Sequence, residues 1–150
     1  MILVDINLLV YATNTRAPQH PAARAWWEQQ LSGENPVGLA WQVLLGFIRI
    51  TTHPKILPVP LTLAEAGSRV DGWLLQPCVQ VLQPAENHWH QLRLMLDVAG
   101  SGGNLVMDAH LAALAVEHDC ELCTADGDFS RFPGVKWRKP LDLASTGTAN

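Results

Sequence analysis

Three short apolar runs, each accompanied by one aspartate, constrain the fold of this chain more than any other feature. Asp5 directly follows the run 2–4, Asp108 follows the run 105–107, and Asp126 comes two residues after the run 122–124. Acids at strand ends or helix starts can converge in space although they are far apart in sequence. Carboxylates that meet without matched cations repel one another, so a cluster of this kind indicates a divalent metal ion.

Strand-like and helix-like segments alternate along the chain. The patterns predict strands at 1–5, 37–40, 79–82, 121–124 and 135–137, and helices at 7–13, 21–31, 41–51, 62–76, 85–99 and 108–118. This alternation predicts an α/β fold with a central, mainly parallel sheet flanked by helices on both faces. Ligands bind beyond the carboxyl ends of the strands in such sheets. Asp5 and Asp126 belong to that edge, and Asp108 can be placed there from the first turn of its helix.

Length and composition indicate one compact domain. The chain has 150 residues, of which 48% are apolar and 16% charged, enough to bury a core. We expect a domain over residues 1–143 and a frayed, small and polar tail over 144–150. The N-terminus lacks the features of a signal peptide, and no apolar run is long enough for a membrane helix. Three cysteines argue against a disulfide framework, so a cytoplasmic protein without a membrane partner is expected.

The charge balance leaves a nucleic-acid enzyme possible. A formal net charge of -4 argues against a generally basic nucleic-acid coat. A local basic rim and a bound metal ion can nevertheless supply a positive field. Four cations around Trp137 form the densest basic segment, namely Arg131, Lys136, Arg138 and Lys139. They are candidates for RNA phosphate contacts, with a charge-protected edge strand as the alternative. Arg49 is a further phosphate-contact candidate.

Four segments together resemble one family, the PIN-domain ribonucleases, and specifically the VapC toxins of bacterial toxin–antitoxin pairs. They are the segments 5–12 (DINLLVYA), 47–51 (FIRIT), 103–115 (GNLVMDAHLAALA) and 124–129 (TADGDF). Each motif is weak alone, but the four stand in the order of the family and at similar intervals. The resemblance covers nearly all of the chain.

The resemblance implies a PIN-like fold and a metal-dependent endoribonuclease that acts on structured RNA such as tRNA or rRNA. It implies Mg²⁺ or Mn²⁺ as the cofactor, a homodimer, and a small VapB-like antitoxin as the partner. The acids of the family fall on Asp5, Asp108 and Asp126, with Asp128 close by as a further metal-site candidate. Asn7 and Thr124 match polar positions that support the metal site.

One position departs from the family pattern. The second acid of the family falls on Gly46, which has no side chain to bind a metal ion. We therefore expect weaker metal binding, partly compensated by Asp128. The alternative is an RNA-binding PIN-like module that lost catalysis. A metal-dependent phosphatase is a more distant alternative, because Asn7 stands where such enzymes have a second aspartate.

Histidines, cysteines and glycines also suggest sites, but simpler explanations are available. His88 and His90 lie about 200° apart on a helix, so they do not readily share an ion. The pair Cys120 and Cys123 has no second pair elsewhere, and core cysteines are expected. His110 is expected at the surface. The glycine-rich loop 100–104 lacks the lysine of a phosphate-binding loop, so we interpret it as a helix entry with Asn104 as the cap.

Overall fold

The computed structural model describes residues 1–100 and 103–144 and has the predicted α/β architecture. One sheet contains five strands in the order β3-β2-β1-β4-β5, and all neighbouring strands are parallel. The strands are β1 (Ile2–Val4), β2 (Val37–Ala40), β3 (Val79–Leu82), β4 (Glu121–Cys123) and β5 (Lys136–Arg138). The helices are α1 (Ile6–Thr13), α2 (His20–Ser32), α3 (Trp41–Thr51), α4 (Leu63–Leu74), α5 (His88–Ala99), α6 (Asn104–Glu117) and α7 (Pro140–Ala144), with a 3-10 turn η1 (Gly127–Arg131).

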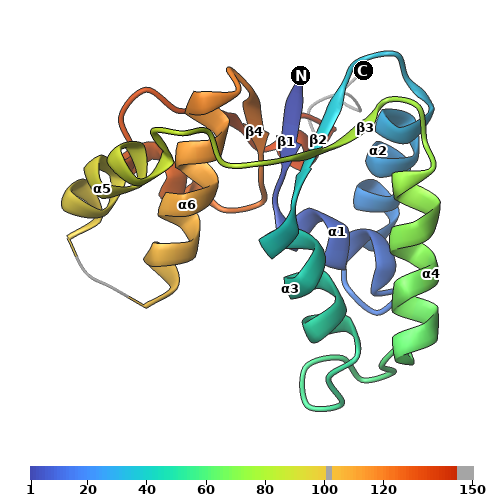
Figure 1. The fold of residues 1–150 in the computed structure, drawn as a ribbon. Coiled ribbons are helices and arrows are strands. Elements are labelled where there is room, and N and C mark those ends of the chain that lie inside the picture. Colours follow the sequence, from blue (N-terminus) through green and yellow to red (C-terminus); the bar gives the residue numbers. More distant parts are fainter. Residues whose placement is uncertain (101–102, 145–150) are drawn as a thin grey trace, which may run out of the picture.

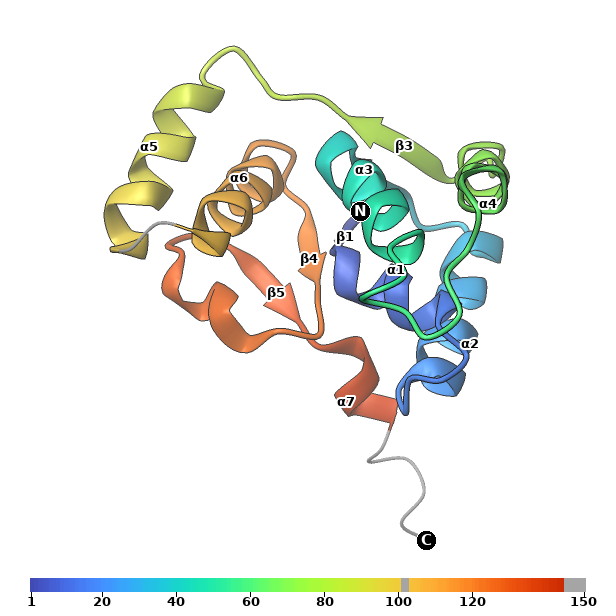
Figure 2. The ribbon, with the colours of Figure 1, turned by 90° about the horizontal axis from the view of Figure 1, so that it is seen from below.

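Helices cover both faces of the sheet, as predicted. Helices α5 and α6 lie on one face, and α1, α2 and α7 lie on the other (Figure 2). The central strands are short and largely buried, with Leu3, Leu39 and Leu122 fully inaccessible to solvent and Glu121 of β4 partly exposed at the start of its strand. Burial on both faces is what continuous apolar strands of a parallel sheet require.

The carboxyl edge of the sheet gathers the acid-bearing segments. Helix α1 begins directly after β1, and α3 begins directly after β2, so both helices start at this edge, while the N-terminus lies at the opposite edge (Figure 1). The amide of Asp5 donates to the carbonyl of Cys123 at 3.0 Å. This bond extends the β1–β4 pairing by one residue and places Asp5 beside the segment that leaves β4.

Element boundaries differ from the sequence prediction mainly around Asp108. Helix α6 begins at Asn104, so Asp108 lies beyond the first turn, and the apolar run 105–107 is helical. Gly103, with a φ of +76°, occupies the N-cap position that we assigned to Asn104. Glycine adopts this left-handed backbone without steric cost. A short apolar run does not by itself distinguish a buried strand from the start of a helix.

Other boundaries shift by one to three residues. Helix α5 begins at His88 rather than at 85, and β5 spans Lys136–Arg138 rather than 135–137. The turn η1 and the short helix α7 were not predicted. The predicted frayed tail falls largely on residues 145–150, which lie outside the described residues, as do residues 101 and 102 of the glycine-rich loop. Across the described ranges, no helix has both the length and the apolar character to cross a membrane.

Candidate active site

Three aspartates that are distant in sequence line one cavity at the carboxyl edge of the sheet. Asp5, Asp108 and Asp126 border a cavity of about 440 Å³ together with Asn7 and residues of α1. Asp5 comes from the end of β1, Asp108 from α6, and Asp126 from the segment after β4. The structure therefore brings together the three acids on which the sequence prediction rests.

Asp5 is held in place by three hydrogen bonds. Its side chain is buried, and one carboxylate oxygen accepts from the amide of Ile6 at 2.7 Å. The other oxygen accepts from the hydroxyl of Thr124 at 2.8 Å and from the side-chain amide of Asn7 at 3.3 Å. Asp5 is also the N-cap residue of α1. Asp5 can both cap α1 and take part in the site, because the capping hydrogen bond uses only one of its two carboxylate oxygens.

Asn7 and Thr124 connect the two strand ends. The amide group of Asn7 donates to the Thr124 hydroxyl at 3.2 Å, and its oxygen accepts from the amide of Ala125 at 3.1 Å. The Thr124 hydroxyl accepts from the amide of Asp126 at 3.0 Å. A fully buried threonine thus links two of the acid-bearing segments. Side chains with this many fixed partners position neighbouring carboxylates in the way that outer-shell groups orient metal ligands.

The carboxylates of the cavity repel one another when they are ionised, and this repulsion helps to raise the pKa values of Asp5 and Asp108. Burial is the main factor that raises the pKa of Asp5, with a further contribution from Asp126, while its hydrogen bonds act in the opposite direction. Burial and the nearby charges of Asp5, Asp126 and Asp128 raise the pKa of Asp108 to about 6, against a smaller opposing effect of Arg131. A cation bound among these carboxylates would remove this repulsion.

The residues fit a cation that keeps part of its water shell. Among the described residues, no three acidic, histidine or cysteine side chains lie close enough together to enclose an ion. Mg²⁺ does not require such a cage, because one or two carboxylates and several waters satisfy it. Hard carboxylate oxygens around an open cavity suit Mg²⁺ or Mn²⁺.

Asp128 and the predicted basic residues are placed differently from the three acids. Asp128 is outside the cavity lining. Its amide donates to the carboxylate of Asp126, and its own carboxylate pairs with Arg131 at 3.5 Å.

The cations around Trp137 each pair with an acid: Lys136 with Asp119, Arg138 with Glu121, and Lys139 with Asp142. Lys136 and Arg138 line a hollow with Met1 and Ile2. That hollow lies at the amino ends of the strands, so the four cations do not form one basic rim beside the acids.

The position of the missing acid is closed by an apolar side chain. A Cβ atom added to Gly46 would lie 2.6 Å from the Cδ1 atom of Ile6. Gly46, Ile6 and Asp108 line a second cavity, of about 430 Å³, which also borders Arg49 and Gln42. No role was predicted for Gln42, although a single amide side chain in the apolar run 41–48 indicates a specific contact. Its Nε2 atom donates to the carbonyl of Met107 at 3.1 Å, from α3 to α6.

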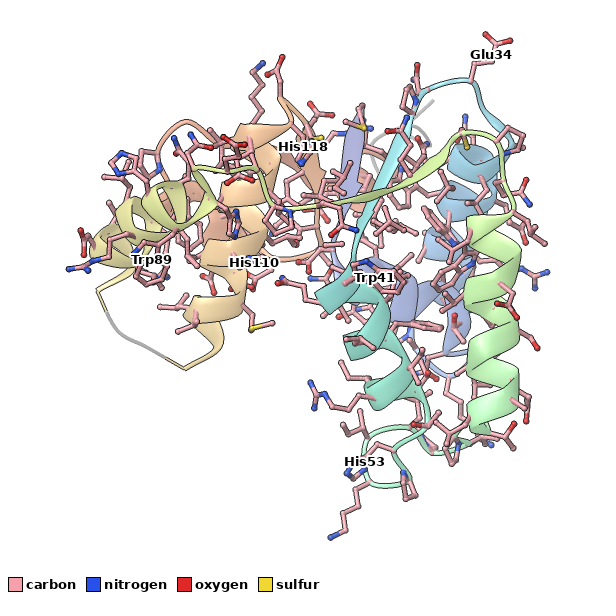
Figure 3. The ribbon with its side chains drawn as sticks, in the orientation of Figure 1. Glu34, Trp41, His53, Trp89, His110 and His118 are labelled. Atoms are coloured by element: carbon pink, nitrogen blue, oxygen red, sulfur yellow. The ribbon has the colours of Figure 1, made fainter. Side chains whose placement is uncertain are left out.

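A partly buried chain of hydrogen bonds joins α5 to α6 and was also not predicted. His88 Nδ1 lies 2.6 Å from a carboxylate oxygen of Glu117, and His88 Nε2 lies 2.7 Å from Nδ1 of His110. His110, for which we expected a surface position, is half-buried, and its ring faces His88 of α5 (Figure 3). Burial lowers the pKa of His110, and the nearby His88 adds to this effect.

Cys120 and Cys123 are buried core residues, as expected. Burial is the main factor that raises the pKa of both thiols. Both cysteines are free rather than joined in a disulfide. Their inaccessibility and raised pKa favour packing over reactivity.

Asp108→Asn is expected to stabilise the metal-free protein above pH 6. The folded state holds the Asp108 proton up to a pKa of about 6, whereas the ordinary value is 3.8. The free energy of unfolding therefore falls as pH rises through this window. After allowance for solvent screening, the variant should gain about 1 kcal/mol at pH 7.5, or about 2–4 °C in Tm. Thermal melts of metal-free protein at pH 4.0 and 7.5 measure this gain.

The same melts with Mg²⁺ provide the control. The wild type should gain stability from Mg²⁺ at pH 7.5, and Asp108→Asn should gain much less. Asp71, an exposed acid on α4, provides the matched variant Asp71→Asn, which should behave as the wild type. A wild-type Tm that is independent of Mg²⁺ at pH 7.5 would contradict the expectation.

The sheet order and the acidic cavity define the class of protein as a PIN domain, and the PIN domain family model matches residues 2–135. The chain is 44% identical over 143 residues to Ribonuclease VapC37 of Mycobacterium tuberculosis, covering 95% of this chain and 99% of that protein. It is 42% identical over 141 residues to Ribonuclease VapC33 of the same species, covering 94% and 99%. The chain therefore belongs to the PIN-domain family, among the VapC ribonucleases.

Solved structures agree on the fold. VapC20 of Mycobacterium tuberculosis, described as a sarcin-ricin loop cleaving toxin, matches with a TM-score of 0.67 at 20% identity, covering 93% of this chain and 100% of that chain. VapBC2 from Rickettsia felis, bound to a DNA fragment from its promoter, matches with a TM-score of 0.66 at 19% identity, covering 92% and 98%. At these identities the likeness concerns the fold alone.

Proposed function

We propose that this chain is the toxin of a toxin–antitoxin pair and acts as a Mg²⁺- or Mn²⁺-dependent endoribonuclease on structured RNA, such as tRNA or rRNA. The observation that carries the proposal is the single cavity lined by Asp5, Asp108 and Asp126. Relatives named as ribonucleases over nearly the whole chain support the same reaction.

Asp5, Asp108 and Asp126 would hold the metal ion, one or two of them directly and the rest through its waters, and Asp128 would add negative charge beside them. When bound, the ion would polarise the scissile phosphate and lower the pKa of a bound water. Thr124 and Asn7 orient Asp5 through hydrogen bonds of 2.8 and 3.3 Å. Arg49, exposed on α3, and Arg131, which is close enough to affect the pKa of Asp108, would contact RNA phosphates. With water as the nucleophile, the RNA 2′-hydroxyl takes no part in bond breaking.

A small VapB-like antitoxin would silence the enzyme, and the active form would be a homodimer. Structures with the same fold are described as VapBC complexes from Rickettsia felis and Haemophilus influenzae. Co-expression of the chain with the product of an adjacent small gene, followed by copurification, tests the antitoxin. Light scattering of the purified protein tests the dimer.

Cleavage of tRNA and rRNA by purified protein tests the proposed reaction. We expect cleavage with Mg²⁺ or Mn²⁺, none in excess EDTA, and recovery when the metal is restored. Asp108→Asn should lack cleavage under all three conditions, and Asp71→Asn should retain it. Cleavage that persists undiminished in EDTA would contradict the proposal.

The absent acid at Gly46 favours one competing function, an RNA-binding module without catalysis. This alternative predicts RNA binding that is insensitive to metal, with no cleavage in the same assay. A metal-dependent phosphatase would instead hydrolyse a chromogenic phosphate ester and leave RNA intact.

A further inference from the structure

The second cavity lies directly beside the acidic one and has a different character. Ile6 and Asp108 border both cavities, so the two are neighbours at the carboxyl edge of the sheet. The second cavity has Leu45 on its α3 side and Met107 on its α6 side. An occupant of this cavity would therefore lie next to whatever binds at the three aspartates.

Gly46 gives the second cavity an apolar wall in place of a carboxylate. The terminal carbon of Ile6 lies where a side chain at position 46 would begin, 2.6 Å from the site of its Cβ atom. Leu45 and Met107 are 62% and 51% exposed. Exposed apolar side chains beside an active site mark a surface that binds an apolar group.

The hydrogen bond between Gln42 and Met107 fixes the two sides relative to each other. It runs from a side chain of α3 to the backbone of α6 at 3.1 Å. Trp41, which precedes Gln42, lies at the start of α3, at the carboxyl end of β2 (Figure 3). The gap between Leu45 and Met107 is therefore held by a specific contact rather than set by loose packing.

Arg49 adds a cation to this apolar surface. It is exposed on α3, borders the second cavity, and forms no ion pair with any residue that the structure describes. By contrast, each of the cations around Trp137 has an acidic partner. An unpaired guanidinium next to an apolar cavity complements a flat ring that carries a phosphate.

We propose that the second cavity is a nucleobase pocket that receives the base of a nucleotide adjoining the scissile phosphate. Leu45 and Met107 contact the ring, Ile6 forms the wall toward the acidic cavity, and Arg49 binds the flanking phosphate. The pocket gives the enzyme a preference for the nucleotide at one position beside the cut. This inference rests on the proposed function, because it takes RNA as the ligand.

Abasic substitution tests the pocket independently of cleavage. RNA oligonucleotides that contain the cut site would carry one abasic ribose at successive positions on either side of it. Binding would be measured by fluorescence anisotropy in the Asp5→Asn background. At one position, loss of the base should weaken binding about 10-fold. We call this loss of affinity the abasic penalty. When Leu45→Ala or Met107→Ala is combined with Asp5→Asn, intact RNA should bind about as weakly as the abasic RNA, so the abasic penalty should disappear.

Leu63→Ala is the matched control for Leu45→Ala, because Leu63 is 71% exposed on α4 and should leave the penalty unchanged. An abasic penalty that is the same in Leu45→Ala and Met107→Ala as in their parent would overturn the proposal. Conversion of a dimer to a monomer by Leu45→Ala, with the penalty unchanged, would assign this face to a second copy of the chain and also overturn it. If the wild type cleaves no RNA, the same scan would be run across a structured RNA that the protein binds. A Leu45-dependent penalty there would retain the base pocket and reject the proposed enzyme.

Discussion

Asp5→Asn is expected to reduce RNA cleavage by at least about 100-fold while the protein stays folded. The substitution keeps the size of the side chain but removes the negative charge that would hold the metal ion. Charge stabilisation by a metal ion contributes several kcal/mol to a transition state, and each 1.36 kcal/mol corresponds to a factor of ten in rate. Single-turnover cleavage with saturating Mg²⁺ and protein measures the loss.

The stability of the same variant separates chemistry from folding. Burial and the charge of Asp126 raise the pKa of Asp5, so loss of the charge offsets part of the cost of placing an asparagine amide against the donors that the carboxylate accepts from. The Tm of the metal-free protein should therefore fall by less than about 5 °C. Asp71→Asn, on the exposed face of α4, controls for loss of a surface charge and should cleave normally. Cleavage within threefold of wild type by a folded Asp5→Asn protein would remove Asp5 from the proposed site.

His88→Ala is expected to cause a large loss of stability. Glu117 has a side chain only 2% exposed, and it accepts from His88 and from the amide of Ala85. Removal of the imidazole leaves a buried carboxylate with too few donors, at a cost of about 2–3 kcal/mol. Thermal melts at pH 7.5 should show a Tm lower by about 5–10 °C.

Two further variants distinguish this hydrogen bond from simple loss of packing. His90→Ala, at an exposed position of the same helix, should change Tm by less than 2 °C. The double variant His88→Leu, Glu117→Leu removes both polar groups and should recover much of the stability, because an apolar pair leaves no buried charge unsatisfied. If the double variant loses as much stability as the single variants His88→Leu and Glu117→Leu lose together, the proposed coupling between His88 and Glu117 is wrong.

The sheet and the three central acids could be predicted because they depend on local patterns. Short uncharged runs required burial, and their alternation with helices required a parallel sheet whose carboxyl edge collects side chains. Asp5 follows β1 directly, and Asp126 follows β4 after two intervening residues, so the topology alone places both at that edge. Asp108 reached the same cavity although its helix begins at Asn104, because a helix passing the edge can present a residue from its second turn.

Contacts between distant side chains could not be predicted from the sequence. Nothing local indicates that Glu117 meets His88 and then His110, or that Gln42 on α3 bonds to the backbone of α6. The basic segment around Trp137 also looked continuous in sequence. Lys136 and Arg138 are two residues apart and so share one face of β5. They pair with Asp119 and Glu121 at the start of β4, in a hollow away from the three aspartates.

The chemistry of the RNA ends tests the central claim most directly, namely that the three aspartates form one metal-dependent site in which water attacks the phosphate. RNA cut by the purified protein in Mg²⁺ would be analysed for its terminal groups by ligation and mass spectrometry. We predict a 5′-phosphate on one product and a 3′-hydroxyl on the other, with no product in EDTA or from Asp5→Asn. A 2′,3′-cyclic phosphate would show that the RNA 2′-hydroxyl is the nucleophile and would contradict the account.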